Sequence, residues 1–350
     1  MVGRTTISCD DGKTWVADRA WDSENNDHLC GSTNVVCDDA SSSCSQRWYD
    51  GECSTFTPCD CGHSPGFSKG VTFDGEQFVA TWGWGWPGTV ARSTNGVDWE
   101  PTMEDANFGG IAFGAGRYVL AARDNFWSAD GVTWTAGATA EFSGPNEPII
   151  WSVRSFAFAD YEAGRFIATA SGNVDMDVLT SSDGGETWWR PSVLPPGCGS
   201  GVSTYGGIVY GNGIIAMIGV GSACRSLDGG DTWTLSTFTD DLIVANPIFR
   251  DGAFWVWSHY DHVLFTSADA LTWTETAMTT PTTLAAVSQN PTTGTLVAVS
   301  SMWQGYDAQE FLRSSDGLTW EALGDGAFVK SHPIFDVQFG YADPSAACPL

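Results

Sequence analysis

Basic side chains are scarce in this sequence of 350 residues. Lys and Arg together number 15 against 42 Asp and Glu, which gives a formal net charge of −27 at pH 7. A surface of that charge repels the phosphates of nucleic acids and anionic lipid headgroups. The sequence also has no apolar run that approaches the ~20 residues needed to cross a bilayer. We therefore expect neither nucleic acid nor a membrane among the partners of this protein.

The sequence begins without a basic-then-apolar leader, yet its cysteines point to export. Six of the ten cysteines lie between residues 30 and 61, and such a density is typical of an oxidising compartment. We expect a secreted or periplasmic protein whose natural N-terminus lies upstream of Met1.

One short phrase is abundant, because it recurs seven times. The typical copy starts with Ser, continues through Asp and Gly, and closes on Trp, as in the segment 226–233, SLDGGDTW. The copies end at Trp15, Trp99, Trp134, Trp188, Trp233, Trp273 and Trp320. Successive Trp residues are 84, 35, 54, 45, 40 and 47 positions apart. A period of roughly 40 to 50 residues is the size of one propeller blade.

The residues of the phrase predict a tight β-turn. Asp accepts hydrogen bonds from the amides that follow it, Gly takes a positive φ, and Trp packs between units. The phrase resembles the Asp-box, also called the bacterial neuraminidase repeat, although Asn95 replaces Asp in the second copy and Ala270 replaces Gly in the sixth. The resemblance implies a turn between the third and fourth strands of a blade, with a folding role and no catalytic one.

A second pattern, two apolar strands around a Gly-bearing turn, repeats between the phrases, as at 207–216. Each unit should therefore be a four-stranded antiparallel meander. We predict an all-β fold, a single seven-bladed β-propeller over residues 1–350. The last unit has only a first strand, near 336–340, while the N-terminus supplies later strands. N- and C-terminal strands are thus expected to share and close one blade.

Cysteine positions suggest how this fold is cross-linked. A Cys9–Cys348 disulfide would lock the shared blade, and Cys198 and Cys224, which flank a single hairpin, form the next pair. The other six cysteines lie in an insertion at 17–66, which explains the long first interval. The insertion is poor in apolar residues, so it would depend on its cross-links. Six cysteines allow 15 connectivities, which remain open.

The five histidines suggest a metal site. Loops that join strands two and three share a face with loops that join successive blades, and we call it the upper face; the insertion at 17–66 belongs there too. His63 and His332 precede first strands, whereas His259 and His262 follow a second strand. We predict a transition-metal site formed by His63, His259 and His332 at the upper mouth of the central channel, with His262 as a fourth ligand or supporting residue.

Copper is favoured over zinc as the metal at this site because oxidising compartments suit copper chemistry. The protein would then be a copper-dependent oxidoreductase, and the alternative is that these histidines are separate, solvated loop residues.

Aromatic residues map to the same face and suggest a ligand pocket. The pocket residues are Trp82, Trp84, Trp86, Tyr260, Trp303 and Tyr306. Such rings stack on a small molecule or a neutral glycan, and with nearby carboxylates they define an alternative function, glycan binding or glycoside hydrolysis. The same rings would otherwise fill gaps between blades.

The resemblance itself leaves the function open. Asp-box propellers include sialidases, other glycoside hydrolases, sorting receptors and photosystem assembly factors. The chain has no arginine cluster at its first strands, so we do not expect a sialidase. A protein-interaction scaffold is the third hypothesis, and we expect a monomer.

Overall fold

The computed structural model of the chain is built from short β-strands joined by turns. It describes residues 6–17, 68–82, 88–96, 99–106, 108–122, 125–137, 152–171, 176–189, 194–198, 207–239, 247–258, 261–300, 310–323 and 337–340. Within these ranges, no helix has the length and apolar character needed to cross a membrane.

Six sheets of three or four strands follow one another along the described part of the chain, and within each sheet the strands pair antiparallel in sequence order. The first two sheets are β3 (Ser68–Phe73), β4 (Phe78–Trp82), β5 (Gly88–Ser93), β6 (Glu100–Ala106), and β7 (Phe108–Gly114), β8 (Arg117–Ala122), β9 (Phe126–Ser128), β10 (Thr135–Ala136). The next two are β11 (Ser152–Ala159), β12 (Arg165–Ser171), β13 (Met176–Ser181), and β14 (Gly207–Gly211), β15 (Ile214–Gly219), β16 (Ser222–Ser226), β17 (Thr234–Thr237). The last two are β18 (Ile248–Arg250), β19 (Ala253–Trp257), β20 (Val263–Ser267), β21 (Thr274–Ala277), and β22 (Leu284–Gln289), β23 (Leu296–Ser300), β24 (Phe311–Ser314), β25 (Glu321–Ala322).

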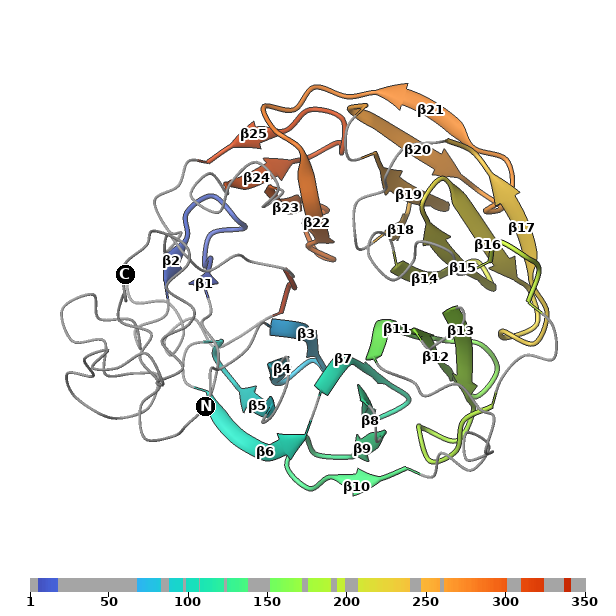
Figure 1. Cartoon of the computed structure of the whole chain (residues 1–350). Coiled ribbons are helices and arrows are strands. Elements are labelled where there is room, and N and C mark those ends of the chain that lie inside the picture. Colours follow the sequence, from blue (N-terminus) through green and yellow to red (C-terminus); the bar gives the residue numbers. More distant parts are fainter. Residues whose placement is uncertain are drawn as a thin grey trace, which may run out of the picture.

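The sheets are arranged around a ring, with the first strand of each sheet nearest the centre and the last strand at the rim (Figure 1). This arrangement is a β-propeller with antiparallel meander blades, as predicted. The third blade has three strands, and an isolated bridge between Thr180 and Trp189 continues it outward.

The described part of the chain forms six blades, and the seventh blade of the prediction is not among them. A two-stranded sheet of β1 (Thr6–Ile7) and β2 (Val16–Ala17) lies between the sixth blade and the first (Figure 1). It holds only the two strands on either side of the first repeat turn. Residues 337–340, expected to supply a first strand here, are not part of any strand in the described ranges.

The seven recurring phrases form one kind of turn, which we call the repeat turn. In the fifth copy Ser226 Oγ donates to Asp228 Oδ1 at 2.8 Å, and the Gly230 amide donates to Ser226 Oγ at 2.8 Å. The Thr232 amide donates to Asp228 Oδ1 at 2.9 Å, and Trp233 Nε1 donates to Gly230 O at 2.9 Å. Each polar residue of the phrase thus satisfies backbone groups of its own turn. Where Ala270 replaces Gly in the sixth copy, it adopts a left-handed φ of 55°.

Hydrogen bonding lowers the pKa of the repeat-turn aspartates below the ordinary value of 3.8. For Asp228, partial burial alone would raise the pKa, but hydrogen bonds from Thr232 and Ser226 outweigh it. In Asp130 the largest cause is the backbone hydrogen bond from Thr133, which directly favours the charged form. The same direction holds for the other copies with Asp, namely Asp10, Asp183, Asp269 and Asp316.

We therefore expect the fold to tolerate mild acid and to fail in stronger acid. A carboxyl whose folded pKa lies below its unfolded value stabilises the fold above that unfolded value, near 3.8, and the contribution is lost as the pH falls through the folded pKa. The melting temperature should be nearly flat from about pH 7 to about pH 5 and should fall steeply below about pH 4. Thermal unfolding across this range checks the expectation. A decline that is already complete above about pH 5 would assign the acid sensitivity to other groups.

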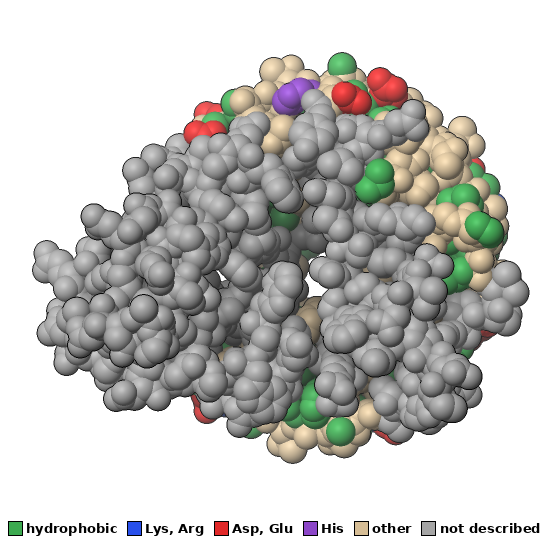
Figure 2. Space-filling model, viewed as in Figure 1, with side chains coloured by type: hydrophobic (Ala, Val, Ile, Leu, Met, Phe, Trp, Pro, Cys, Tyr) green, Lys and Arg blue, Asp and Glu red, His purple; other side chains and the backbone are tan. Residues whose placement is uncertain are grey.

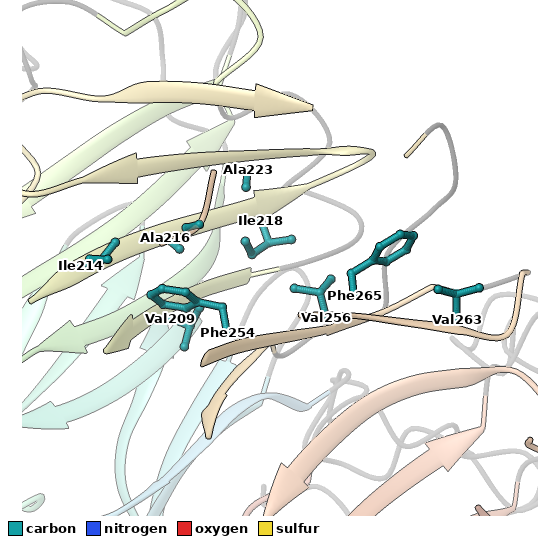
Figure 3. Close-up of a cluster of buried hydrophobic side chains, with 10 residues drawn as sticks. Val209, Ile214, Ala216, Ile218, Ala223, Phe254, Val256, Val263 and Phe265 are labelled. Atoms are coloured by element: carbon teal, nitrogen blue, oxygen red, sulfur yellow. The ribbon is translucent and has the colours of Figure 1, made fainter. Parts of the chain in front are cut away.

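Apolar side chains of neighbouring blades pack face to face. Figure 3 shows Val209, Ile214, Ala216, Ile218 and Ala223 of one blade against Phe254, Val256, Val263 and Phe265 of the next. All of these side chains are buried. The core is therefore divided among the interfaces between blades, and each blade depends on its neighbours.

Arginine side chains also join successive blades, a role that the sequence analysis missed. In each case a side chain of one blade donates to a main-chain oxygen in the repeat turn that follows. The pairs are Arg117 with Asp183 O at 3.1 Å, Arg225 with Asp269 O at 3.1 Å, Arg250 with Ser315 O at 3.2 Å and Arg313 with Asp11 O at 3.0 Å. Gln77 takes this place in the first blade, where its side chain donates to Asp130 O at 3.0 Å. Four of the few arginines in this chain thus form hydrogen bonds between neighbouring blades.

The contact between Arg313 and Asp11 belongs to a polar network around Asp11, the residue that follows the repeat-turn aspartate of the first copy. Its carboxylate accepts hydrogen bonds from Asn290 Nδ2 at 2.7 Å, Thr293 Oγ1 at 3.0 Å and Thr295 Oγ1. Arg313 Nη2 donates to the same carboxylate at 3.0 Å. The N-terminal sheet is therefore fastened to the sixth blade, about 280 to 300 residues away in sequence.

Candidate functional site

Most of the predicted site residues lie outside the described ranges. These are His63, His259 and His332 of the proposed metal set and Trp84, Trp86, Tyr260, Trp303 and Tyr306 of the proposed pocket. Two predicted residues fall within the described ranges: Trp82 ends β4, and His262 immediately precedes β20. The geometry of the candidate site is therefore built from the strand ends to which these residues are joined.

Hydrogen bonds hold the backbone on either side of residues 259 and 260, next to His262. The Ser258 amide donates to Val263 O at 2.8 Å, and the Val263 amide donates to Ser258 Oγ at 3.3 Å. His262 has a left-handed φ of 52°, a conformation that is uncommon for a residue with a side chain. Its carbonyl accepts a hydrogen bond from the Met278 amide at 2.8 Å. Backbone contacts of Ser258 with Val263 and of Met278 with His262 thus position His262, which is only partly exposed.

Strand pairing places the strand ends next to His63 and Trp303 on one face, whereas no strand pairing is described for residues 337–340, which follow His332. Ser68, at the start of β3, pairs with Trp82, at the end of β4. In the same way Leu284 pairs with Ser300 in the sixth blade. His63 precedes Ser68 by five residues, and Trp303 follows Ser300 by three. The first strands begin, and the second strands end, on the same face of the ring, which is the upper face of the prediction.

Acidic side chains are visible on the face of the molecule that Figure 2 shows. Figure 2 shows acidic side chains at several points along the rim and no Lys or Arg side chain among the coloured atoms of this face. Within the described ranges, no three His, Cys, Asp or Glu side chains converge as a metal-binding group. Any site that gathers the predicted histidines must therefore use residues beyond those ranges.

A disulfide joins Cys198 and Cys224, the pair predicted from the hairpin between them. Their Cα atoms are 5.6 Å apart, and both residues are buried against Met217, Ile215 and Trp233. The bond ties residues 194–198 to the middle strand β16. Cys9 is also disulfide-bonded. Its partner lies outside the described ranges, as does Cys348, so the Cys9–Cys348 bond stays a prediction.

The sequence matches no protein-family model and no curated protein. Its structure is similar to several solved structures at low sequence identity. One is virginiamycin B lyase from Staphylococcus aureus, with a TM-score of 0.57 and 12% identity over 79% of this chain and 90% of that one. Another is YCF48 bound to D1 peptide, with a TM-score of 0.52 and 14% identity over 76% of this chain and 84% of that one.

A third similar structure is the GH74 enzyme of Niastella koreensis. The TM-score is 0.54 and the identity is 19%, over 80% of this chain but only 41% of that enzyme. Proteins as different as a lyase, a GH74 enzyme and YCF48 share a fold with this chain, at identities too low to carry an activity across. The comparisons therefore establish a β-propeller fold and leave its function to the residues of the chain itself.

Proposed function

We propose that the protein binds a transition metal, copper in preference to zinc, through His63, His259 and His332 at the upper mouth of its central channel. His262 is a fourth ligand or orients the others. The observation that carries this proposal is the fixed backbone on either side of residues 259 and 260, where Ser258 pairs with Val263 and the Met278 amide donates to the carbonyl of His262. A ligand residue that is joined to fixed strand ends is positioned at lower entropic cost, as a metal site requires.

Three neutral imidazoles with an open position suit Cu or Zn, and a bound copper would supply one-electron chemistry to a ligand at that position. We accordingly propose a copper-dependent oxidoreductase whose substrate is a small molecule. The aromatic residues Trp82, Trp84 and Tyr260 would shape the pocket beside the metal. The protein would act as a monomer in the extracellular space or periplasm, a location consistent with the Cys198–Cys224 disulfide.

Elemental analysis tests the metal directly. Protein purified without a chelating tag and dialysed against Cu(II) should hold about one copper per chain, with nitrogen hyperfine structure in its electron paramagnetic resonance spectrum. His259→Ala should lose stoichiometric copper because it removes one of three ligands. His28→Ala, which removes a histidine outside the proposed set, is the matched control. Copper content unchanged by His259→Ala would refute the proposed ligand set.

Glycan binding or glycoside hydrolysis is the second candidate. It is supported by Trp82, which ends β4 directly opposite Ser68 and so marks the upper end of the first blade. Trp82, Trp84, Trp86, Tyr260, Trp303 and Tyr306 would together form the stacking surface. A protein without copper that binds neutral polysaccharide, and loses that affinity in Trp84→Ala, would favour this function over the first.

We further propose that the ring is an Asp-box propeller completed by a seventh blade that both chain ends share. Gly340 supports this placement. Its α-carbon faces Phe73 and Phe78 of the first blade so closely that a Cβ would lie within 3 Å of both rings. Gly114 faces Phe158 of the following blade in the same manner, and Gly211 faces Phe249. Gly340 thus contacts the first blade in the same way as Gly114 and Gly211, at the ends of their first strands, contact the blade that follows each of them.

A further inference from the structure

The outer strand β21 is the longest of the strands that are exposed at every residue, among those whose burial is described. All four of its residues, Thr274 to Ala277, are exposed. It pairs with β20 along one edge only and forms the rim of its blade (Figure 1). The comparable strand β17 is partly covered, because Ser236 Oγ donates to Ala270 O of the next blade at 3.1 Å.

The segment around β21 is rich in threonine and nearly uncharged. Seven of the twelve residues from 272 to 283 are Thr, one is Pro281, and Glu275 carries the only charge. Thr272, Thr274, Thr276 and Thr279 are all exposed. No contact within the described ranges engages the hydroxyl of Thr274 or Thr276. Since side chains alternate along a strand, these two hydroxyls point to one side, roughly 7 Å apart.

Such an edge is a liability that proteins usually protect. Exposed edge strands carry charges or Pro to prevent pairing with another chain. The first blade follows this rule, since β6 contains Pro101 together with Glu100, Glu104 and Asp105. In contrast, β21 has Glu275 alone. Exposed Thr clusters next to Pro are typical of O-glycosylated segments, whose sugars keep other chains away.

We propose that Thr274 and Thr276 are O-glycosylation sites. The threonine Oγ1 would attack the anomeric carbon of a sugar activated as a nucleotide or polyprenyl phosphate. A new C–O bond forms, the bond from the sugar to phosphate breaks, and the phosphate leaves with the electron pair while a transferase base takes the hydroxyl proton. The linkage is O-linked because the sequence has no Asn-X-Ser/Thr acceptor in which X differs from Pro; Asn290-Pro291-Thr292 is excluded on that ground.

This inference rests on the proposed export of the chain and not on the proposed metal. The test is the intact mass of the protein recovered from the extracellular or periplasmic fraction of its own producing organism. Fragmentation that retains the glycosidic bond then locates the modification. We expect a mass above that of the bare chain by whole sugar units, located at Thr274 or Thr276. A bare chain, or sugar found only at other residues, would overturn the proposal.

Variants sharpen the test in the same host. Replacing both residues by alanine should remove the added mass completely, whereas Thr274→Ser with Thr276→Ser keeps the acceptor hydroxyls and should retain it. The matched control is Thr234→Ala with Thr237→Ala, two exposed residues of β17 without a neighbouring Thr-Pro cluster, and its mass should keep every sugar unit. Copper content measured on the same samples separates the two proposals, because sugar without copper contradicts only the metal site.

Discussion

Replacing Asp11 with alanine should lower the free energy of unfolding by about 3 kcal/mol. The carboxylate accepts hydrogen bonds from Asn290, Thr293, Thr295 and Arg313, all in the sixth blade. The Asp11 and Arg313 side chains are only 22% and 27% exposed, so water replaces the lost partner poorly. Removing one member of a part-buried charged network leaves the others incompletely satisfied, which is why the cost exceeds that of one exposed ion pair.

Urea unfolding monitored by tryptophan fluorescence measures this effect. The matched control is Glu100→Ala, which breaks an ion pair with Arg92 of similar length, 2.8 Å, but with side chains 34% and 66% exposed. That change should cost at most ~1 kcal/mol. If Asp11→Ala is no more damaging than Glu100→Ala, the network does not close the ring.

The second large effect concerns Trp257, the last residue of β19. Its side chain is 1% exposed, it meets Trp320 edge to face at 6.1 Å, and its Nε1 donates to Gly317 O at 3.0 Å. Trp257→Ala should cost about 3 to 5 kcal/mol, because it opens a large cavity and removes one of the two indole donors to the Gly317 carbonyl, the other being Trp320 Nε1. The same variant should weaken copper binding if His259, two residues later, is a ligand.

Trp257→Phe separates the two causes of this loss. Phenylalanine refills most of the cavity but cannot donate to Gly317 O, so its cost should approach that of one hydrogen bond, about 1 to 2 kcal/mol. Leu227→Ala is the control for a large apolar side chain on the surface, since Leu227 is 57% exposed, and it should change stability by less than ~0.5 kcal/mol. Equal losses of stability for Trp257→Ala and Leu227→Ala would show that Trp257 does not anchor the interface between the fifth and sixth blades.

Local spacing predicted the parts of the fold that are made locally. The Ser, Asp and Gly of each phrase lie within a few residues of one another, so their hydrogen bonds could be expected before any tertiary contact was known. The Cys198–Cys224 bond follows from the same logic, because a single hairpin separates the two residues. The number of blades does not depend on contacts between neighbouring residues, and the six described blades differ from the predicted seven.

The candidate site lies between these two cases. The sequence placed His63, His259, His262 and His332 in loops of one face, and the pairing of Ser68 with Trp82 agrees with that assignment of strand ends. Convergence of the imidazoles on one point is a further step, and it stays a prediction. The contact from Met278 to His262 had no signal in the sequence, because it joins two segments through backbone atoms that every residue possesses.

By itself, then, the sequence determined the repeat turns, the antiparallel meanders and the propeller class, because each arises from turn chemistry and alternation over a few neighbouring residues. Tertiary structure alone decided which blade meets which, and it selected Asp11 rather than Asp10 to bridge to Arg313. It also brought Arg117, Arg225 and Arg250 into contact with the repeat turn of the next blade. The physical reason is that these contacts depend on the tilt and spacing of blades around the ring, which bring together residues with no fixed separation in sequence.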